Sequence, residues 1–231
     1  MRSTPAVVTT SFSTPLATIT GFMARIRLIF LLFVSTLFAT PALGDNATCI
    51  LVFGDSIGAS LGVPAGRRWV DLLAQQLDGC SIVNASISGE TTEGGKARLP
   101  PLLSEYRPRI VLLELGGNDG LRGFPPASIR TNLTRMIADA HAAGSKVLLL
   151  GMRIPPNYGP SYTKAFHALY GEIARQNATA LVPFLLDGIA TDPGLMQTDG
   201  IHPNTAAQPL IVANVLPILS VMVQDADDGS H

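Results

Sequence analysis

The stretch Ile-Leu-Val-Phe-Gly-Asp-Ser at residues 50–56 is an uninterrupted apolar run that ends in a glycine, an acid and a serine. A run that is apolar at every position is typical of a strand buried on both faces of a parallel sheet. We expect this strand at residues 50–53. Four further short apolar runs follow, and we expect strands there too, at residues 82–84, 110–115, 146–151 and 181–184.

Segments with apolar residues at helical spacing separate these runs. The apolar residues recur every three or four positions, so one side of each segment packs a helix on the sheet. The segments lie at residues 69–77, 129–140, 162–173 and 210–223. Alternating strands and helices with right-handed crossovers predict an α/β fold, a three-layer α/β/α sandwich around a five-stranded parallel sheet. We expect a single domain over residues 45–231.

The first 44 residues have the order of a secretory signal. Arg25 and Arg27 precede an apolar run of about 12 residues, and Ala42-Leu43-Gly44 supplies the small residues that a signal peptidase accepts. The run is shorter than the ~20 residues that a membrane-spanning helix needs, so we expect no stable membrane span. We predict that residues 1–44 are a signal peptide, with Met23 as an alternative start and cleavage between residues 42 and 45. The mature protein is then periplasmic or secreted.

Composition narrows the class of protein. Apolar residues make up 47% of the chain and charged residues 14%, which argues against disorder. From Asp45 onward there are 13 basic and 17 acidic residues, a net charge of −4. Binding of nucleic acid phosphates needs a basic excess on some face, so we expect no nucleic acid partner.

The chain has two cysteines, Cys49 and Cys80, and each lies just before a predicted strand. If the two strands are parallel neighbours, both thiols lie at the same end of the sheet. An exported protein meets an oxidising compartment, in which an even number of thiols is usually paired. We predict a Cys49–Cys80 disulfide; the alternative is two small buried side chains.

Chemically useful residues follow the predicted strands, at the edge where sheets of this type bind ligands. Ser56 follows the first strand, Gly89 the second and Asn118 the third, and Asp199-Gly-Ile-His202 lies near the C-terminus. A serine hydroxyl needs a base to become a nucleophile; His202 is suited to that role, and Asp199 to orienting its imidazole. The backbone N–H groups of Ser56 and Gly89 and the Asn118 amide can donate to an oxyanion.

Each of these residues alone has a simpler interpretation. Ser56 fits the N-cap of the first helix, and Gly89 fits a turn with positive φ. Asn118 fits a cap or turn position, while Asp199 and His202 fit a local hydrogen bond or half of a metal site. No further His or Cys lies at ligand spacing near that pair, so we expect no metal. The presence of all the parts at strand ends of one chain favours the catalytic interpretation.

Five sequence blocks together resemble the SGNH (GDSL-type) hydrolases, and among them the exported arylesterase and thioesterase/lysophospholipase subgroup. The resemblance implies a flavodoxin-like sheet order and a serine hydrolase without a cofactor. It implies Ser56 as the nucleophile, Asp199 and His202 as its triad partners, and the Ser56 N–H, the Gly89 N–H and the Asn118 side chain as the oxyanion hole. The blocks lie at residues 50–56, 83–92, 114–123, 153–159 and 199–204.

The chain departs from the family pattern at two positions. Ile57 stands where the GDSL signature has leucine, a swap that conserves volume and that we expect to be mild. Leu61 stands where many relatives have an aromatic residue, which predicts a reshaped acyl pocket.

Three further predictions concern the edges of the site. Residues 120–125 are flanked by glycines and are predicted to form a mobile lip over the substrate, with an ordered connection as the alternative. Asn157 is a candidate substrate contact, with a turn role as the alternative. Asp55 is interpreted as a structural hydrogen-bonding residue, because Asp199 is already beside His202.

These observations predict an exported serine hydrolase that cleaves small-molecule acyl esters and thioesters through an acyl-enzyme on Ser56. One alternative is a carbohydrate O-deacetylase or an acyltransferase that uses the same triad. The other is a non-catalytic flavodoxin-like binding protein, although no phosphate-cradling glycine-rich loop supports it.

Overall fold

The computed structural model describes residues 49–77 and 79–228. The predicted signal peptide, residues 1–44, and its cleavage site lie outside the described residues and stay predictions.

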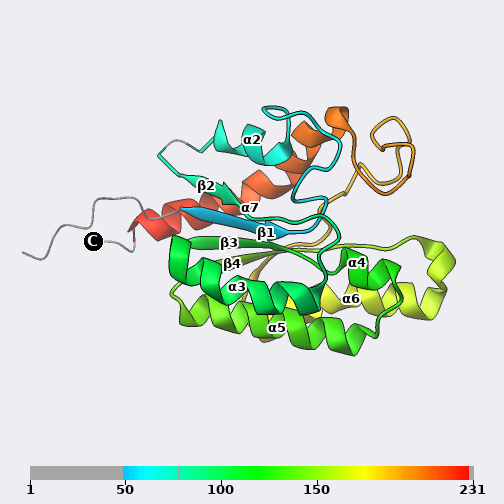
Figure 1. Cartoon of the computed structure of the whole chain (residues 1–231), viewed down its shortest axis with the longest axis horizontal. Helices are drawn as coiled ribbons and strands as arrows, with labels where there is room; N and C mark the ends of the chain where they lie inside the picture. The colour runs from blue at the N-terminus through cyan, green and yellow to red at the C-terminus, as the bar shows by residue number, and fades with distance from the viewer. Residues whose placement is uncertain (1–48, 78, 229–231) are drawn as a thin grey trace, which may run out of the picture. The chain divides into compact units, whose positions relative to one another are not determined.

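Five parallel strands form one sheet in the order β2-β1-β3-β4-β5, which confirms the predicted α/β fold and the flavodoxin-like order (Figure 1). The chain leaves β1 for one edge of the sheet and then crosses back to β3, so the switch point lies between β1 and β3. Ligands bind outside the carboxyl ends of the strands at such a point. The strands are β1 Ile50–Gly54, β2 Ile82–Asn84, β3 Ile110–Glu114, β4 Lys146–Leu150 and β5 Ala180–Val182.

Helices cover both faces of the sheet. Figure 1 shows α2 and α7 on one face and α3, α5 and α6 on the other, as the three-layer prediction required. The helices are α2 Trp69–Ala74, α3 Thr92–Tyr106, α4 Gly117–Leu121, α5 Pro126–Ala142, α6 Pro160–Gln176 and α7 Gln208–Asp228, with short 3-10 turns η1 Pro156–Tyr158 and η2 Thr205–Ala207.

The uniform apolar runs are explained by two separate cores. In β1, Ile50 and Val52 belong to the core under α2 and α7, whereas Leu51 and Phe53 belong to the core under α3, α5 and α6. Successive side chains of a strand point to opposite faces, so both sets must be apolar when both faces are covered.

Helix α3 was not predicted from the sequence. Of its four buried positions, Thr92, Gly95, Leu99 and Leu103, only two are large and apolar, so the apolar stripe is weak. The helix also contains Pro100 and Pro101, which lack the N–H that a helix interior uses. Tertiary contact with α5 therefore outweighs a poor local signal.

Two of the predicted boundaries that differ from the structure involve prolines. Strand β5 ends at Val182, before Pro183, since proline cannot donate to a strand ladder. Helix α7 continues to Asp228, through Pro217 and five residues beyond the expected end. The segment Thr205–Ala226 is long and apolar enough to cross a membrane by length and composition, but Ile211, Val215 and Leu219 are buried in the core.

The predicted disulfide joins Cys49 and Cys80, whose Cα atoms lie 5.1 Å apart. The bond lies at the amino ends of β1 and β2, where Ile50 is paired with Ile82. It ties the edge strand β2 to the centre of the sheet, at the end opposite to the candidate site.

Candidate active site

Ser56 lies in a tight turn directly after β1, not at the start of a helix. The Asp55 carboxylate accepts the Ile57 N–H at 3.0 Å, and the Ser56 carbonyl accepts the Leu61 N–H at 3.0 Å. The first described helix begins only at Trp69, so the interpretation of Ser56 as its N-cap is wrong. The turn instead presents the Ser56 hydroxyl at the carboxyl edge of the sheet.

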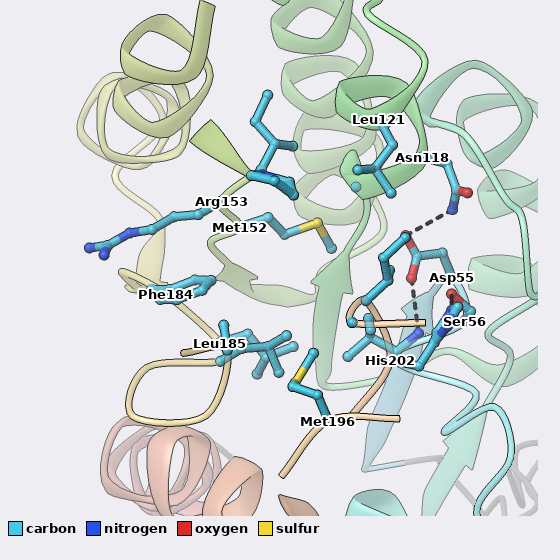
Figure 2. Close-up of a pocket in the computed structure, with 18 of the residues that line it drawn as sticks. Asp55, Ser56, Asn118, Leu121, Met152, Arg153, Phe184, Leu185, Met196 and His202 are labelled. Atoms are coloured by element: carbon cyan, nitrogen blue, oxygen red, sulfur yellow. Dashed lines mark hydrogen bonds between the residues drawn. The ribbon is translucent and has the colours of Figure 1, made fainter. Parts of the chain in front are cut away.

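Ser56, His202 and Asp199 form one continuous chain of hydrogen bonds. His202 Nε2 lies 2.8 Å from Ser56 Oγ, and His202 Nδ1 lies 2.7 Å from Asp199 Oδ2. Figure 2 shows the imidazole beside the serine at one end of a pocket. The chain brings together residues 146 positions apart in the sequence, as the strand-end argument predicted.

The loop from Asp199 to His202 keeps the Asp199 carboxyl group ionised. The backbone N–H groups of Ile201 and His202 both donate to Asp199 Oδ1, at 2.9 and 3.0 Å. The hydrogen bonds from the His202 backbone, from its ring and from Ile201 lower the pKa of Asp199 to about 2. An ionised Asp199 accepts a hydrogen bond from the Nδ1–H of His202, so the lone pair of Nε2 is directed at Ser56 Oγ. That is the arrangement of a general base.

Asn118 lies at the second position of α4, and its amide is oriented by the turn that carries the serine. Asn118 Nδ2 donates to Asp55 Oδ2 at 3.1 Å, which leaves its second N–H for another acceptor (Figure 2). The entry to α4 requires glycine: Gly116 has a φ of 116°, and a Cβ there would lie 2.4 Å from the Tyr170 hydroxyl. Asn118 and Ser56 line the same cavity.

Gly89 lies on the loop after β2, which runs beside the nucleophile turn. The Ala85 and Ile87 N–H groups donate to the carbonyls of Val52 and Gly54, so the loop continues the ladder past the end of β1. Gly89 has a φ of 82°, as the turn interpretation also required. It is not among the residues that line the cavity, and an oxyanion role for its N–H stays a prediction.

A largely apolar cavity of about 570 Å³ extends from Ser56 and His202 toward the ends of β4 and β5. Figure 2 shows Phe184 and Arg153 at the end away from Ser56, where the guanidinium lies 4.7 Å from the ring centroid. The volume is typical of small-molecule sites. The principal apolar lining residues are Leu121, Met152, Ile154, Phe184, Leu185 and Met196.

The sequence model of the GDSL-like Lipase/Acylhydrolase family matches residues 52–209, about two thirds of the chain and all the residues of the triad. The chain belongs to this family. Its blocks and fold therefore agree with the resemblance inferred from the residues alone.

Individual relatives are similar over most of their length. Esterase TesA of Pseudomonas aeruginosa is 53% identical over 181 residues, which cover 77% of this chain and 90% of the relative. Thioesterase 1/protease 1/lysophospholipase L1 of Escherichia coli K12 is 45% identical over 166 residues, covering 71% and 80%. The crystal structure of the psychrotrophic esterase EstA from Pseudoalteromonas sp., inhibited by monoethylphosphonate, is 41% identical with a TM-score of 0.72, covering 77% of this chain and 99% of EstA.

Sequence reasoning missed Glu114, which lies beneath the turn that carries Ser56. Glu114, at the end of β3, is fully buried, and its Oε2 accepts the N–H groups of Asp55 and Gly58 at 3.0 and 2.8 Å. Gly54 leaves room for it, because a Cβ there would lie 2.3 Å from that oxygen. A charged residue closing the run Ile-Val-Leu-Leu-Glu was the available signal.

Burial explains the charge state of this carboxyl pair. Desolvation raises the pKa of Asp55 to about 6, and desolvation followed by the charge of Asp55 raises the pKa of Glu114 well above its usual value. Two buried carboxylates so close together disfavour double ionisation, and burial favours the protonated form of Glu114. Asp55 keeps its expected structural role, and it also orients Asn118.

The structure does not bring Asn157 or Leu61 to the cavity. Asn157 lies on the exposed η1 turn, where Pro155 and Pro156 occupy the edge of the cavity instead. The interpretation of Asn157 as a turn residue therefore fits better than that of a substrate contact. Leu61 is 46% exposed and outside the lining residues, and its carbonyl accepts a bond from Gln197. Leu61 therefore makes no direct contribution to the wall of the cavity, contrary to the predicted reshaping of the acyl pocket.

The predicted lip, residues 120–125, is partly helical, since α4 extends to Leu121. Tyr158 donates to the Leu121 carbonyl at 2.8 Å, and Tyr162 donates to the Phe124 carbonyl at 2.6 Å. Leu121 lines the cavity, so the segment does form one wall of the site. Its mobility stays a prediction.

Proposed function

We propose that the protein hydrolyses carboxylic esters and thioesters through an acyl-enzyme formed on Ser56. The observation that carries the proposal is the Ser56–His202–Asp199 hydrogen-bond chain at the end of an apolar cavity. The names of the similar proteins, an esterase and a thioesterase/lysophospholipase, support the same reaction class.

In the proposed reaction, Ser56 Oγ attacks the substrate carbonyl carbon while His202 Nε2 removes the hydroxyl proton. Asp199 stays ionised and stabilises the imidazolium. The tetrahedral intermediate then collapses, and His202 gives its proton to the departing alcohol or thiol. A water molecule attacks the acyl-enzyme with His202 again as the base, releasing the acid and the free serine.

The negative oxygen of the tetrahedral intermediate needs donors that are already in position. The Ser56 and Gly89 N–H groups and the second N–H of Asn118 are the proposed donors. Each donor of this kind stabilises the transition state by about 3 to 4 kcal/mol. Because the Asp55 carboxylate holds the other N–H of Asn118, the amide is oriented before substrate arrives.

The apolar cavity suits the acyl part of the substrate. Burying a methylene group there is favourable by about 0.8 kcal/mol, so the affinity of the cavity for a substrate depends on the length of its acyl chain. The leaving group is expected on the solvent side, which agrees with a small-molecule ester or thioester of small or medium acyl length.

An exported location is part of the proposal. It rests on the secretory pattern of residues 1–44 and on the Cys49–Cys80 disulfide, since such bonds persist in oxidising compartments. A periplasmic or secreted enzyme satisfies both observations.

The test is hydrolysis of p-nitrophenyl esters from short to long acyl chains, and of acyl-CoA thioesters, by the purified protein. The wild type is expected to show a chain-length optimum. Ser56→Ala is expected to lose activity by at least about 10⁴-fold, whereas the matched control Ser88→Ala, an exposed serine of the neighbouring loop, keeps it.

Two results would overturn the proposal. One is equal activity of Ser56→Ala and the wild type. The other is a folded wild type that cleaves no ester or thioester of the series but deacetylates an acetylated oligosaccharide, which would establish the deacetylase alternative.

A further inference from the structure

Asp119 follows Asn118 in α4, and it is a buried acid that the proposed reaction does not use. Its side chain is 2% exposed, and within the described residues no Lys or Arg pairs with it. Both carboxylate oxygens instead bind one residue, Thr92. The Thr92 N–H donates to Oδ2 at 2.9 Å, and the Thr92 hydroxyl donates to Oδ1 at 2.6 Å.

Thr92 is itself fixed from a third side. It is completely buried, and its hydroxyl oxygen accepts a bond from Asn132 Nδ2 of α5 at 3.1 Å. With the hydroxyl proton committed to Asp119 and the lone pair to Asn132, the Thr92 side chain has one favourable rotamer. A buried network that is satisfied in this way is rigid.

Thr92 and Asp119 lie close in the sequence to the two proposed oxyanion donors, Gly89 and Asn118. Thr92 is three residues beyond Gly89, and Asp119 is adjacent to Asn118. The Gly89 loop follows β2 and the Asn118 helix follows β3, but β1 lies between these strands. Ladder hydrogen bonds therefore do not join the two segments directly; each is bonded to the end of β1, the Gly89 loop through Ile87 and Asn118 through Asp55. A contact that joins the two segments to each other therefore bears on their separation.

A second, weaker contact joins the same two segments at the surface. The Arg122 guanidinium, just past α4, donates to the Gly89 carbonyl at 3.3 Å and is exposed. A long exposed hydrogen bond contributes little, so the buried Asp119–Thr92 pair is the stronger of the two connections.

We propose that Asp119 and Thr92 are positioning residues that set the distance between the Asn118 amide and the Gly89 N–H above Ser56. Neither residue of the pair lines the cavity; the pair acts through the two donors. The proposal rests on the proposed function, in which both groups bind the oxyanion. Donors are effective only when they are preorganised, and a displacement of about 1 Å costs on the order of 100-fold in rate.

The first test is the kinetics of Thr92→Val on a short-chain p-nitrophenyl ester. Valine keeps the shape but removes both hydroxyl bonds, so we expect kcat to fall about 10- to 100-fold with KM changed less than about 2-fold. Thr92→Ser restores the hydroxyl and should remain within about 3-fold of wild type. In an Asn118→Ala background, Thr92→Val should cost less than about 3-fold, because one of the two positioned donors is already gone.

A stability control separates positioning from folding. Ser145 is buried and donates to the Pro108 carbonyl at 2.6 Å, at the amino end of β4, so Ser145→Ala removes a similar bond far from the site. Its Tm should fall, although by less than that of Thr92→Val, which loses two hydrogen bonds, and its kcat should be unchanged. The proposal is wrong if kcat falls as much in Ser145→Ala as in Thr92→Val. It is also wrong if Thr92→Val lowers kcat by the same factor in the Asn118→Ala background as in the wild type.

A readout without turnover distinguishes this proposal from the proposed function. In nitrogen-15 NMR spectra, Thr92→Val should shift both the Asn118 side-chain amide and the Gly89 amide signals, whereas Ser145→Ala should shift neither. Unshifted signals overturn the positioning role even if the enzyme is active. Shifted signals support it even if the wild type proves inactive on every ester, a result that would remove the proposed function alone.

Discussion

The side chains on the two sides of Ser56 differ in polarity. On the side of β2 and β3, buried polar groups bind one another: Glu114 holds the nucleophile turn, Asp55 holds Asn118, and Asp119 holds Thr92. On the side of β4 and β5, the cavity is lined mainly by apolar side chains such as Phe184. The difference separates two tasks, since fixed dipoles stabilise developing charge whereas apolar surface discriminates among acyl chains.

The largest effect on this contrast comes from the base. His202→Ala removes the only group within hydrogen-bond distance of Ser56 Oγ among the described residues, so kcat should fall about 10⁴- to 10⁶-fold. The measurement is kcat on a p-nitrophenyl ester over a pH series. His141→Ala, a histidine exposed at the end of α5, is the matched control and should retain full activity. An unchanged kcat in His202→Ala would contradict the proposed catalytic role of the triad.

Next in size is the loss of an oxyanion donor on the polar side. Asn118→Ala should lower kcat about 100- to 1,000-fold and leave KM nearly unchanged, because the donor acts mainly in the transition state. Steady-state kinetics separate the two parameters. The control is Asn157→Ala: Asn157 is exposed and lies outside the cavity, so this substitution should change neither kcat nor KM. If Asn118→Ala changes KM alone, its amide binds the ground state instead.

The two aspartates of the site should respond to pH with opposite signs. The pKa of Asp55 is raised to about 6, so folding favours its protonated form; that stability is full below about pH 4 and is lost as pH rises through about 6. The pKa of Asp199 is lowered to about 2, so its contribution is present above about pH 4 and is lost as pH falls toward 2.

Chemical denaturation of Asp55→Asn and Asp199→Asn at several pH values tests this contrast. Relative to Asp55→Asn, the wild type should lose on the order of 2 kcal/mol of unfolding free energy between pH 4 and 7. Relative to Asp199→Asn, it should lose stability only on acidification below pH 4. Parallel curves for the wild type and Asp55→Asn would contradict the burial argument.

The smallest effect is expected on the apolar side. Phe184→Ala should lower kcat/KM about 10-fold for the acyl chain at the length optimum and leave the shortest ester within about 2-fold, since the shortest chain is not expected to extend to that end of the cavity. Phe124→Ala, 40% exposed and outside the cavity, is the control. An equal loss on all chain lengths would mean that Phe184 supports the catalytic residues rather than the acyl chain.

Most of the fold and the triad could be predicted because their signals are local. Each strand is an apolar run, and Ser56, Asn118 and His202 each lie within a recognisable sequence block. Glu114 and Thr92 could not be predicted in the same way. Their importance comes from partners distant in sequence, the nucleophile turn for Glu114 and Asp119 for Thr92, which only the folded chain brings near.

The 146-residue separation of Ser56 and His202 has a consequence for the life of the chain. During synthesis the serine emerges early, whereas the histidine emerges shortly before α7, the last helix described. A nascent, truncated or unfolded chain therefore carries a hydroxyl with no base beside it. The Ser56 hydroxyl therefore gains its base only when the segment that carries His202 has folded against the turn after β1.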